Sequence, residues 1–377
     1  MQAALSCLEQ CAYDHRDFVE RLEGAPCDLA RVGQAGVAPV QDFRAPWWQP
    51  GGHVQTIWSA LCASTRGPCR ADVRWQRQRW ETPDGDFIDL DVAAPGSAPQ
   101  APTHVPTLVL FHGLEGSSAS HYALALARVC ADRGWRLVVP HFRGCSGEPN
   151  RLPRAYHSGD AAELDWILRR LRGQVGGDLL AMGVSLGGNA LALWAGQQQE
   201  AARDVVRAAA VVCAPLDLMA AGLQLGQGVN RRLYTRMFLR TLVPKALAKW
   251  ELSPGLFDRT ALRRARDLHA FDDIFTGPVH GFAGADDYWR RASAKPWLRQ
   301  VAVPLLLLNA RNDPFVPAAS LPARKDVSAA VQLWQPPHGG HVGFSSGAWP
   351  AHLLAMPQAV TAWLAQWLED NKEQSNG

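Results

Sequence analysis

A serine lies between two glycines in the stretch Gly183-Val184-Ser185-Leu186-Gly187, which has the form G-x-S-x-G. An apolar run typical of a buried strand precedes this stretch, and a run typical of a helix, Ala190–Ala195, follows it. A strand, a sharp turn and a helix in this order form a nucleophile elbow, which exposes the serine hydroxyl for acyl transfer. The pattern alone is common, so the function depends on whether the chain supplies partners for Ser185.

An acyl-transfer serine needs a base and an acid that orients this base. In one common arrangement both follow the serine along the chain, the acid first and the histidine second. Asp313 fits the acid, because it follows the apolar run Leu305–Asn309 and precedes a proline. His341 fits the base, because glycines on both sides place it in a loop that can approach Ser185. Ser185, Asp313 and His341 are therefore the candidate catalytic residues.

Two other residues compete for these roles. His338 lies three residues before His341, and composition alone does not separate the two histidines, although the G-G-H-x-G-F context favours His341. Asp217 follows the apolar run that ends at Cys213, and it is the second candidate for the acid.

The loop that begins at His112 predicts one half of an oxyanion hole. The sequence His112-Gly113-Leu114 follows the first predicted parallel strand, where an H-G-x loop is the expected source of one amide donor. Leu114 would donate one backbone N–H and Leu186, directly after the serine, would donate the other. His112 itself is expected to hydrogen-bond the loop backbone.

Other reactive side chains receive mainly structural interpretations. The aromatic stretch Pro46–Thr56 is expected to pack onto the main domain as an N-terminal arm, although His53 within it could act as a ligand or base. Cys145 lacks a base motif of its own, and Arg143 is expected to pair with Glu148 or another buried carboxylate.

Strand and helix patterns alternate along most of the chain, which predicts an α/β fold with a mostly parallel sheet and helices on both faces. A D-G turn predicts an antiparallel hairpin ahead of the parallel strands. The expected strands are 73–81, 87–93, 107–112, 136–140, 179–182, 208–213 and 305–309, and the expected helices are 119–133, 158–172 and 351–369, with Trp363 and Trp367 on the inner face of the last.

The segment 217–299 interrupts this alternation with helical periodicity. An insertion of this length between two strands predicts a helical cap over the sheet edge, and its apolar residues would form an acyl pocket. The expected organisation is an N-terminal extension over 1–38 with little to anchor it, a core over 39–216 and 300–370, the cap, and a polar tail over 371–377. The candidate pocket residues in the cap are Leu223, Leu225, Leu233, Met237 and Phe238.

Composition narrows the class of protein. The chain has 377 residues, is 47% hydrophobic and carries a formal net charge of +3 without a long block of like charge, so a nucleic-acid partner is not expected. None of the 8 cysteines forms a C-x-x-C pair, which favours free thiols in a reducing compartment over disulfides or zinc. No signal-peptide pattern and no transmembrane run is present, so a cytoplasmic location is expected. The oligomeric state stays open.

Several motifs together resemble the YheT-like branch of α/β-hydrolases, the AB hydrolase 4 family. The resemblance extends from about Pro46 to about Phe344. It implies an α/β-hydrolase fold with Ser185 as nucleophile, Asp313 as acid, His341 as base, and Leu114 and Leu186 at the oxyanion site. The motifs are PWWQPGGHVQT, TPDGDFIDLD, FHGLEGSS, HFRGCSGEPNR, YHSGD, GVSLGGN, FDD, HGF, RNDPF and HGGHVGF.

The resulting hypothesis is a carboxylesterase-type serine hydrolase (EC 3.1.1) that acts without metal or organic cofactor. The resemblance implies short- to medium-chain acyl esters, and the partner is a small ester or lipid-like substrate. An acyltransferase that passes the acyl group to an alcohol shares the same residues and is the alternative. A ligand-binding protein without catalysis is a third possibility, which a complete Ser-Asp-His set disfavours.

Overall fold

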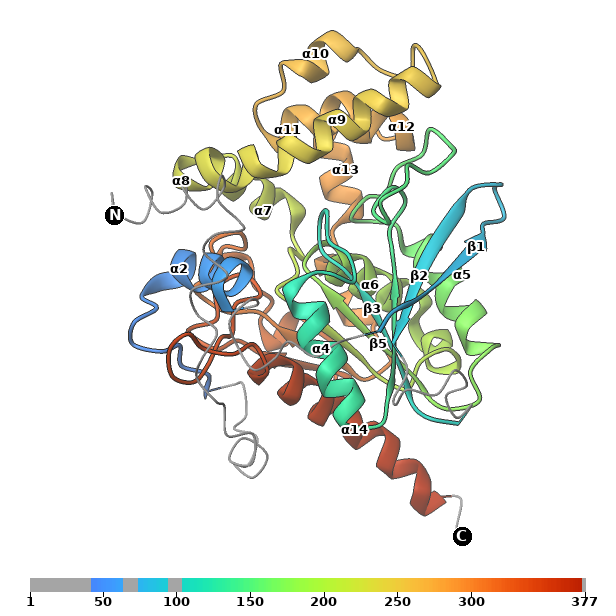
Figure 1. The fold of residues 1–377 in the computed structure, drawn as a ribbon, viewed down its shortest axis with the longest axis vertical. Coiled ribbons are helices and arrows are strands. Elements are labelled where there is room, and N and C mark those ends of the chain that lie inside the picture. The colour runs from blue at the N-terminus through green and yellow to red at the C-terminus, as the bar shows by residue number, and fades with distance from the viewer. Residues whose placement is uncertain (1–41, 64–73, 94–103, 375–377) are drawn as a thin grey trace. The chain divides into compact units, whose positions relative to one another are not determined.

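The central feature of the computed structural model, which describes residues 42–63, 74–93 and 104–374, is an eight-stranded sheet (Figure 1). Its strand order is β1-β2-β4-β3-β5-β6-β7-β8. The pairs β1–β2 and β2–β4 are antiparallel, and all other neighbours are parallel. The strands are β1 (Gln76–Glu81), β2 (Phe87–Ala93), β3 (Thr107–Phe111), β4 (Arg136–Pro140), β5 (Leu179–Val184), β6 (Ala209–Val212), β7 (Leu305–Leu308) and β8 (Val331–Trp334).

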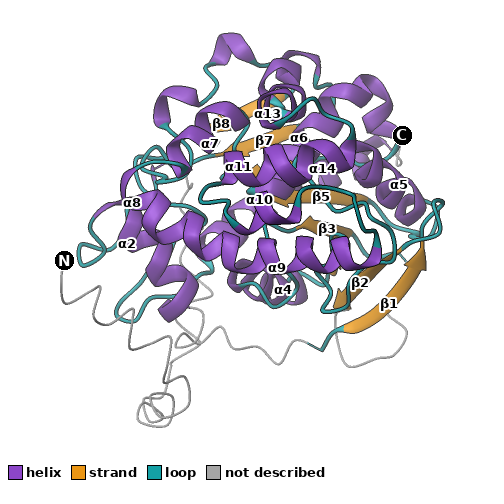
Figure 2. Cartoon of the chain, turned by 90° about the horizontal axis from the view of Figure 1, so that it is seen from above, coloured by secondary structure: helices purple, strands orange, loops and turns teal. Residues whose placement is uncertain are grey.

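Helices cover both faces of this sheet (Figure 2). One apolar cluster joins α5 (Ala161–Arg172) and α6 (Leu186–Gln198) to one set of alternate strand residues. A second cluster joins α4 (His121–Asp132) and α14 (Ala355–Gln374) to the other set. Because both faces are buried, β3, β5, β6 and β7 are continuous apolar runs without alternation. The predicted α/β class and mostly parallel sheet are therefore confirmed.

Two details differ from the sequence analysis. The short strand β8 was not expected, and it extends the parallel sheet beside β7. On the last helix Trp363 is buried as expected, whereas Trp367 is 37% exposed and contacts the Trp363 ring edge-on at a centroid distance of 5.8 Å. The expected strand start at Val73 lies outside the described residues, and β1 begins at Gln76.

A run of short helices connects β6 to β7, which pair directly with each other. These helices have a small apolar core of their own around Leu242, Leu262 and Phe275. In Figure 1 the helices α9 to α12 lie together at the top of the view, beyond the sheet. The elements are α7 (Leu218–Leu225), α8 (Gly228–Asn230), η6 (Arg231–Thr235), α9 (Arg236–Leu252), α10 (Arg259–Arg263), α11 (Leu268–Phe271), η7 (Asp272–Thr276), α12 (Gly277–His280) and α13 (Ala285–Ala292).

The remaining helical elements are short: two precede β1, one follows α6, one precedes β7, and two lie between β7 and β8. No helix in the described part of the chain combines the length and the apolar character needed to cross a membrane. The elements are α2 (Gly51–Trp58), η4 (Ser59–Ala63), η5 (Gln199–Asp204), η8 (Lys295–Gln300), η9 (Ala318–Ser320) and η10 (Arg324–Asp326).

Candidate active site

Ser185 occupies a strained turn between β5 and α6. Its φ of 53° and ψ of −118° lie in a region that non-glycine residues rarely adopt, and its N–H donates to Val212 O at 2.9 Å. A Cβ at Gly187 would lie 2.5 Å from the main-chain oxygens of Phe111 and His112. Only glycine therefore lets α6 begin this close to β3, and the turn holds the serine at the end of the strand.

His341 and Asp313 form a hydrogen-bonded chain with this serine. Nε2 of His341 lies 2.9 Å from Oγ of Ser185, and Nδ1 lies 2.8 Å from Oδ2 of Asp313. The other carboxylate oxygen of Asp313 accepts the N–H of Phe315 at 2.7 Å, which fixes the carboxyl plane. The Phe315 ring also packs on the imidazole at a centroid distance of 4.1 Å. The structure thus brings together the three residues predicted to be catalytic.

The two residues predicted to supply the oxyanion hole lie close to Ser185 in the structure. A Cβ at Gly113 would lie 3.2 Å from Cβ of Ser185, so the loop carrying Leu114 passes directly against the serine. The hydroxyl of Tyr122 accepts the Gly113 N–H at 2.9 Å and holds this loop. Leu114 and Leu186 both line the cavity that contains Ser185 and His341.

The competing histidines do not take part in this arrangement. His338 is exposed, whereas His341 contacts the serine. His112 is fully buried, with Nδ1 2.8 Å from Gly113 O and with Nε2 accepting the N–H of Phe142 at 3.1 Å. Burial lowers the pKa of His112 to about 3, so the ring stays neutral and serves the loop backbone, as predicted.

Asp217 and Cys145 do not fit the roles of acid and nucleophile either. Asp217 caps α7 by accepting the Ala220 N–H at 3.0 Å. Burial raises the pKa of the Cys145 thiol to about 12, which disfavours the thiolate that a nucleophile requires. Among the described residues, Cys130, Cys145 and Cys213 are free thiols.

The helix α2 holds both loops that carry His341 and Asp313, a role that the sequence analysis missed. Oε1 of Gln55 accepts the Gly339 N–H at 2.9 Å and Nδ2 of Asn312 at 2.9 Å. Oγ1 of Thr56 accepts the N–H of His341 at 2.8 Å. The aromatic stretch Pro46–Thr56, which includes both residues, indicated packing onto the domain, but no local signal identified these two side chains as supports of the site.

His53 on the same helix contacts the segment between β6 and β7. Its Nδ1 lies 3.1 Å from Oη of Tyr234, and the two rings stack with an interplanar angle of 6°. Tyr234 in turn packs edge-on against Phe315, the neighbour of His341. The expected packed arm is therefore present, and His53 belongs to an aromatic contact rather than to the Ser185 chain.

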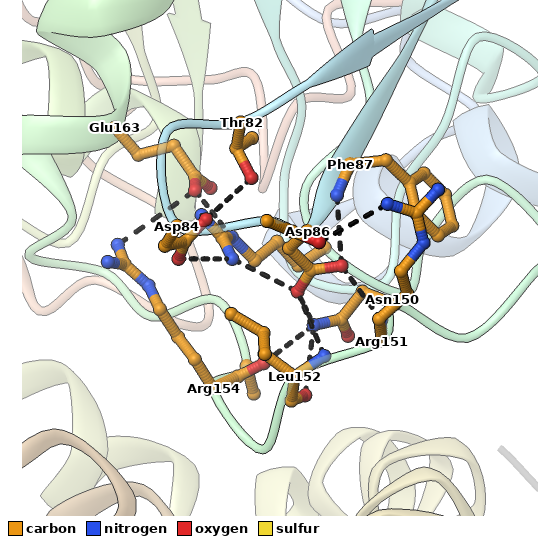
Figure 3. Close-up of polar contacts among 12 residues, drawn as sticks. Thr82, Asp84, Asp86, Phe87, Asn150, Arg151, Leu152, Arg154 and Glu163 are labelled. Carbon is orange, nitrogen blue, oxygen red and sulfur yellow. Dashed lines mark hydrogen bonds and ion pairs between the residues drawn. The ribbon is translucent and has the colours of Figure 1, made fainter.

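A buried ionic cluster fixes the loop after β4 (Figure 3). The Arg143 guanidinium bonds Glu163 at 2.6 Å, Asp84 at 2.9 Å and Asp86 at 3.0 Å. Of the two expected partners, Glu148 or another buried carboxylate, the second is therefore present. Burial by itself would raise the pKa of Asp86, but hydrogen bonds from Asn150 and from backbone N–H groups outweigh it and lower the pKa. The cluster ties the hairpin turn and α5 to the 143–154 loop.

Helix α9 is attached to the same loop by Lys249. Its Nζ donates to the main-chain oxygens of Asn150 and Leu152, both at 2.6 Å. Lys245 on this helix also reaches the loop after β3, where it pairs with Glu115 at 2.9 Å. The segment between β6 and β7 is thus bonded to two loops that border Ser185.

A cavity of about 590 Å³ opens above Ser185 and is lined by residues of both the sheet loops and this helical segment. Its size and mainly apolar lining are typical of a site for a small organic molecule. Of the proposed pocket residues, Leu225 and Phe238 line it. Leu223 and Met237 are each 52% exposed, and Leu233 packs in the apolar cluster around Tyr234 and Phe315, so these three do not line it. Burial raises the pKa of Asp272, which also lines the cavity, to about 6.

Comparisons with known proteins agree with this geometry. A family model described as alpha/beta hydrolase fold matches residues 106–348. The chain is 40% identical over 321 residues to YheT of Escherichia coli strain K12, a protein named as a candidate esterase, and the match covers 84% of this chain and 91% of that protein. It is 28% identical over 337 residues to the phospholipase ABHD3 of Mus musculus, which covers 85% of this chain and 80% of that one.

The fold is also similar to a solved structure. Est1E from Butyrivibrio proteoclasticus superposes with a TM-score of 0.51 at 16% identity, covering 78% of this chain and 99% of that one. This likeness concerns the fold alone.

Proposed function

Because the chain belongs to the α/β-hydrolase family, in its YheT-like branch, and is an esterase- or lipase-type hydrolase, we propose that it cleaves carboxylic esters through an acyl-serine intermediate. The observation that carries this proposal is the unbroken chain of hydrogen bonds from Asp313 through His341 to Ser185 at the wall of an apolar cavity. Each residue then has one role, derived from its position.

In the first half of the reaction, Oγ of Ser185 attacks the ester carbonyl carbon while Nε2 of His341 takes the hydroxyl proton. Asp313, which accepts from Nδ1, holds the imidazole in the required tautomer and stabilises its cation. The negative charge that forms on the carbonyl oxygen is stabilised by the N–H groups of Leu114 and Leu186. One such donor is worth roughly 2.7–4 kcal/mol of barrier.

The tetrahedral intermediate then collapses, and the ester C–O bond breaks. His341 returns its proton to the departing alcohol oxygen, which leaves the acyl group on Ser185. A water molecule then gives a proton to His341 and attacks the acyl carbon. The second collapse releases the carboxylic acid and restores the Ser185 hydroxyl.

The helical segment 217–299 acts in this proposal as a cap that forms the acyl pocket. The support is that Leu225, Phe238 and Leu242 line the same cavity as Ser185. A cavity of about 590 Å³ suits short- to medium-chain acyl groups, and its apolar wall keeps bulk water from the acyl-enzyme. The proposed reaction class is that of a carboxylesterase.

A fluorophosphonate probe tests the nucleophile directly. The wild-type chain should be labelled once, and Ser185→Ala should fold with an unchanged melting temperature and lose both labelling and ester hydrolysis. Ser158→Ala is the matched control, since this hydroxyl lines the same cavity but is bonded to Asn189 at 3.1 Å. Undiminished labelling of Ser185→Ala would refute the assignment.

A further inference from the structure

Helix α9 presents two different faces. Phe238, Leu242 and Lys249 line the cavity on one face. Arg236 and Arg240 are exposed, and their spacing of four residues places them together on the surface of the helix. One helix thus separates the proposed acyl pocket from an arginine-bearing surface.

This surface carries an uncompensated positive charge. Residues 218–250 contain no Asp or Glu, whereas they contain six basic residues. Lys245 forms an ion pair with Glu115 in the loop after β3, and Lys249 donates a hydrogen bond to Asn150 O in the 143–154 loop. The side chains of the other four are exposed and form no ion pair or hydrogen bond with any described residue, as is also the case for Arg263, Arg264 and Arg266. These four are Arg231, Arg232, Arg236 and Arg240.

Apolar side chains are exposed among these arginines. Val229, two residues before Arg231, is 61% exposed, and Met237, directly after Arg236, is 52% exposed. We call the four arginines with Val229 and Met237 the basic face.

We propose that the basic face binds the surface of an anionic lipid bilayer, with the arginines at the headgroups and Val229 and Met237 inserted among them. Helical surfaces that mix basic and exposed apolar residues are typical of peripheral membrane binding. Arginines alone would suit any polyanion, but the apolar residues between them favour a bilayer over a nucleic acid. The inference concerns binding and holds independently of the proposed hydrolysis.

Bilayer binding would place α9 between the membrane and the cavity. A substrate that leaves the lipid would then have only this helix and its ends to pass before it reaches Ser185. The geometry therefore adds a route for lipid-like esters to the proposed active site.

The test uses the full chain and vesicles of phosphatidylcholine with or without 30% phosphatidylglycerol, in a sedimentation assay. We expect binding to the anionic vesicles that weakens with added salt, because each arginine near an anionic surface contributes about 1 kcal/mol, or about fivefold in affinity. Arg232→Gln/Arg236→Gln/Arg240→Gln should therefore weaken binding on the order of 100-fold. Melting temperatures verify that each variant is folded.

The matched control removes three exposed arginines from α10 and the loop after it, in the same helical segment but outside the basic face. Arg263→Gln/Arg264→Gln/Arg266→Gln has the same net charge as the first variant, so general electrostatics affects both equally. We expect it to keep most of the vesicle affinity. Equal weakening in both variants, or no binding of the wild-type chain to anionic vesicles, would overturn the proposal.

A second pair of substitutions distinguishes a bilayer from another polyanion. Val229→Ser/Met237→Gln should weaken vesicle binding and leave retention on heparin unchanged, because only a bilayer offers an apolar phase. If this variant binds vesicles as tightly as the wild type does, the basic face recognises charge alone and the proposal is wrong.

Discussion

Replacing Thr56 by valine tests whether helix α2 positions the proposed base. Thr56 is 8% exposed, and its Oγ1 donates to Gly52 O at 2.7 Å while it accepts the His341 N–H at 2.8 Å. Valine keeps the shape of the side chain but replaces this hydroxyl with a methyl group. A Cβ at Gly340 would lie 2.8 Å from Oγ1, which shows how closely the histidine loop packs here.

The size of the effect follows from the donor that loses its acceptor. A buried donor without an acceptor costs about 1–3 kcal/mol. If this penalty acts on the conformation that places Nε2 of His341 2.9 Å from Ser185, the active population falls by up to about 5- to 150-fold. We expect the loss in kcat rather than in KM, because Thr56 does not line the cavity.

The assay measures kcat and KM with a p-nitrophenyl ester, together with the rate of fluorophosphonate labelling and the melting temperature. Thr56→Ser keeps the hydroxyl and is the matched control, with kcat expected within about threefold of the wild type. Equal loss in Thr56→Ser and Thr56→Val would show that the hydroxyl is not the cause. A lower melting temperature of Thr56→Val with unchanged kcat would refute the positioning role.

Four further predictions concern the site and the cavity. His341→Ala should lower kcat by several orders of magnitude, while His338→Ala should change it only a few-fold, and the reverse ranking would identify His338 as the base. Asp313→Asn should lower kcat about 10⁴-fold, because the amide favours the wrong imidazole tautomer, and a loss below about tenfold would point to another acid. Leu225→Trp should shift the chain-length profile of ester hydrolysis toward shorter acyl groups, and the shift should be graded because one methylene contributes only about 1–3 kcal/mol of binding free energy in an apolar pocket. An unchanged profile in a folded variant would exclude this residue from the specificity of the pocket. Burial raises the pKa of Asp272 from 3.8 to about 6, so the charged carboxylate destabilises the folded state above pH 6 and its protonation removes this cost at lower pH. The free energy of unfolding of the wild type should therefore rise by up to about 2–3 kcal/mol relative to that of Asp272→Asn as the pH falls from 8 to 4. Denaturation at several pH values measures this difference, and a constant difference would contradict the prediction.

The parts of the fold that carry local signals could be predicted from the sequence. Buried parallel strands are continuous apolar runs, and the turn at Ser185 requires glycines at fixed positions, so β5 and the elbow follow from the sequence alone. Asp313 was singled out because it follows an apolar run and precedes a proline, and His341 because glycines on both sides place it in a loop. Each of these signals lies within one short, continuous stretch of the sequence.

The features that were missed depend on contacts between distant parts of the chain. Gln55 and Thr56 are ordinary helix residues until their side chains meet loops 257 to 285 residues away. The partners of Arg143 could not be ranked, because Asp84 and Glu163 approach it only after the hairpin and α5 have packed. Exposure of Leu223 and Met237 likewise depends on which side of each helix faces the cavity, which helical periodicity alone does not decide.

The support that α2 gives to the histidine loop also determines when an active molecule can arise during translation. Helix α2 and the Ser185 elbow are synthesised long before His341, and a nascent chain released short of this residue lacks the imidazole and leaves Gln55 and Thr56 without these partners. Closing so long a loop costs chain entropy before the contact compensates for it, so we expect this contact to form slowly. The proposed activity therefore requires translation beyond His341, and shorter products would carry Ser185 without its proposed base.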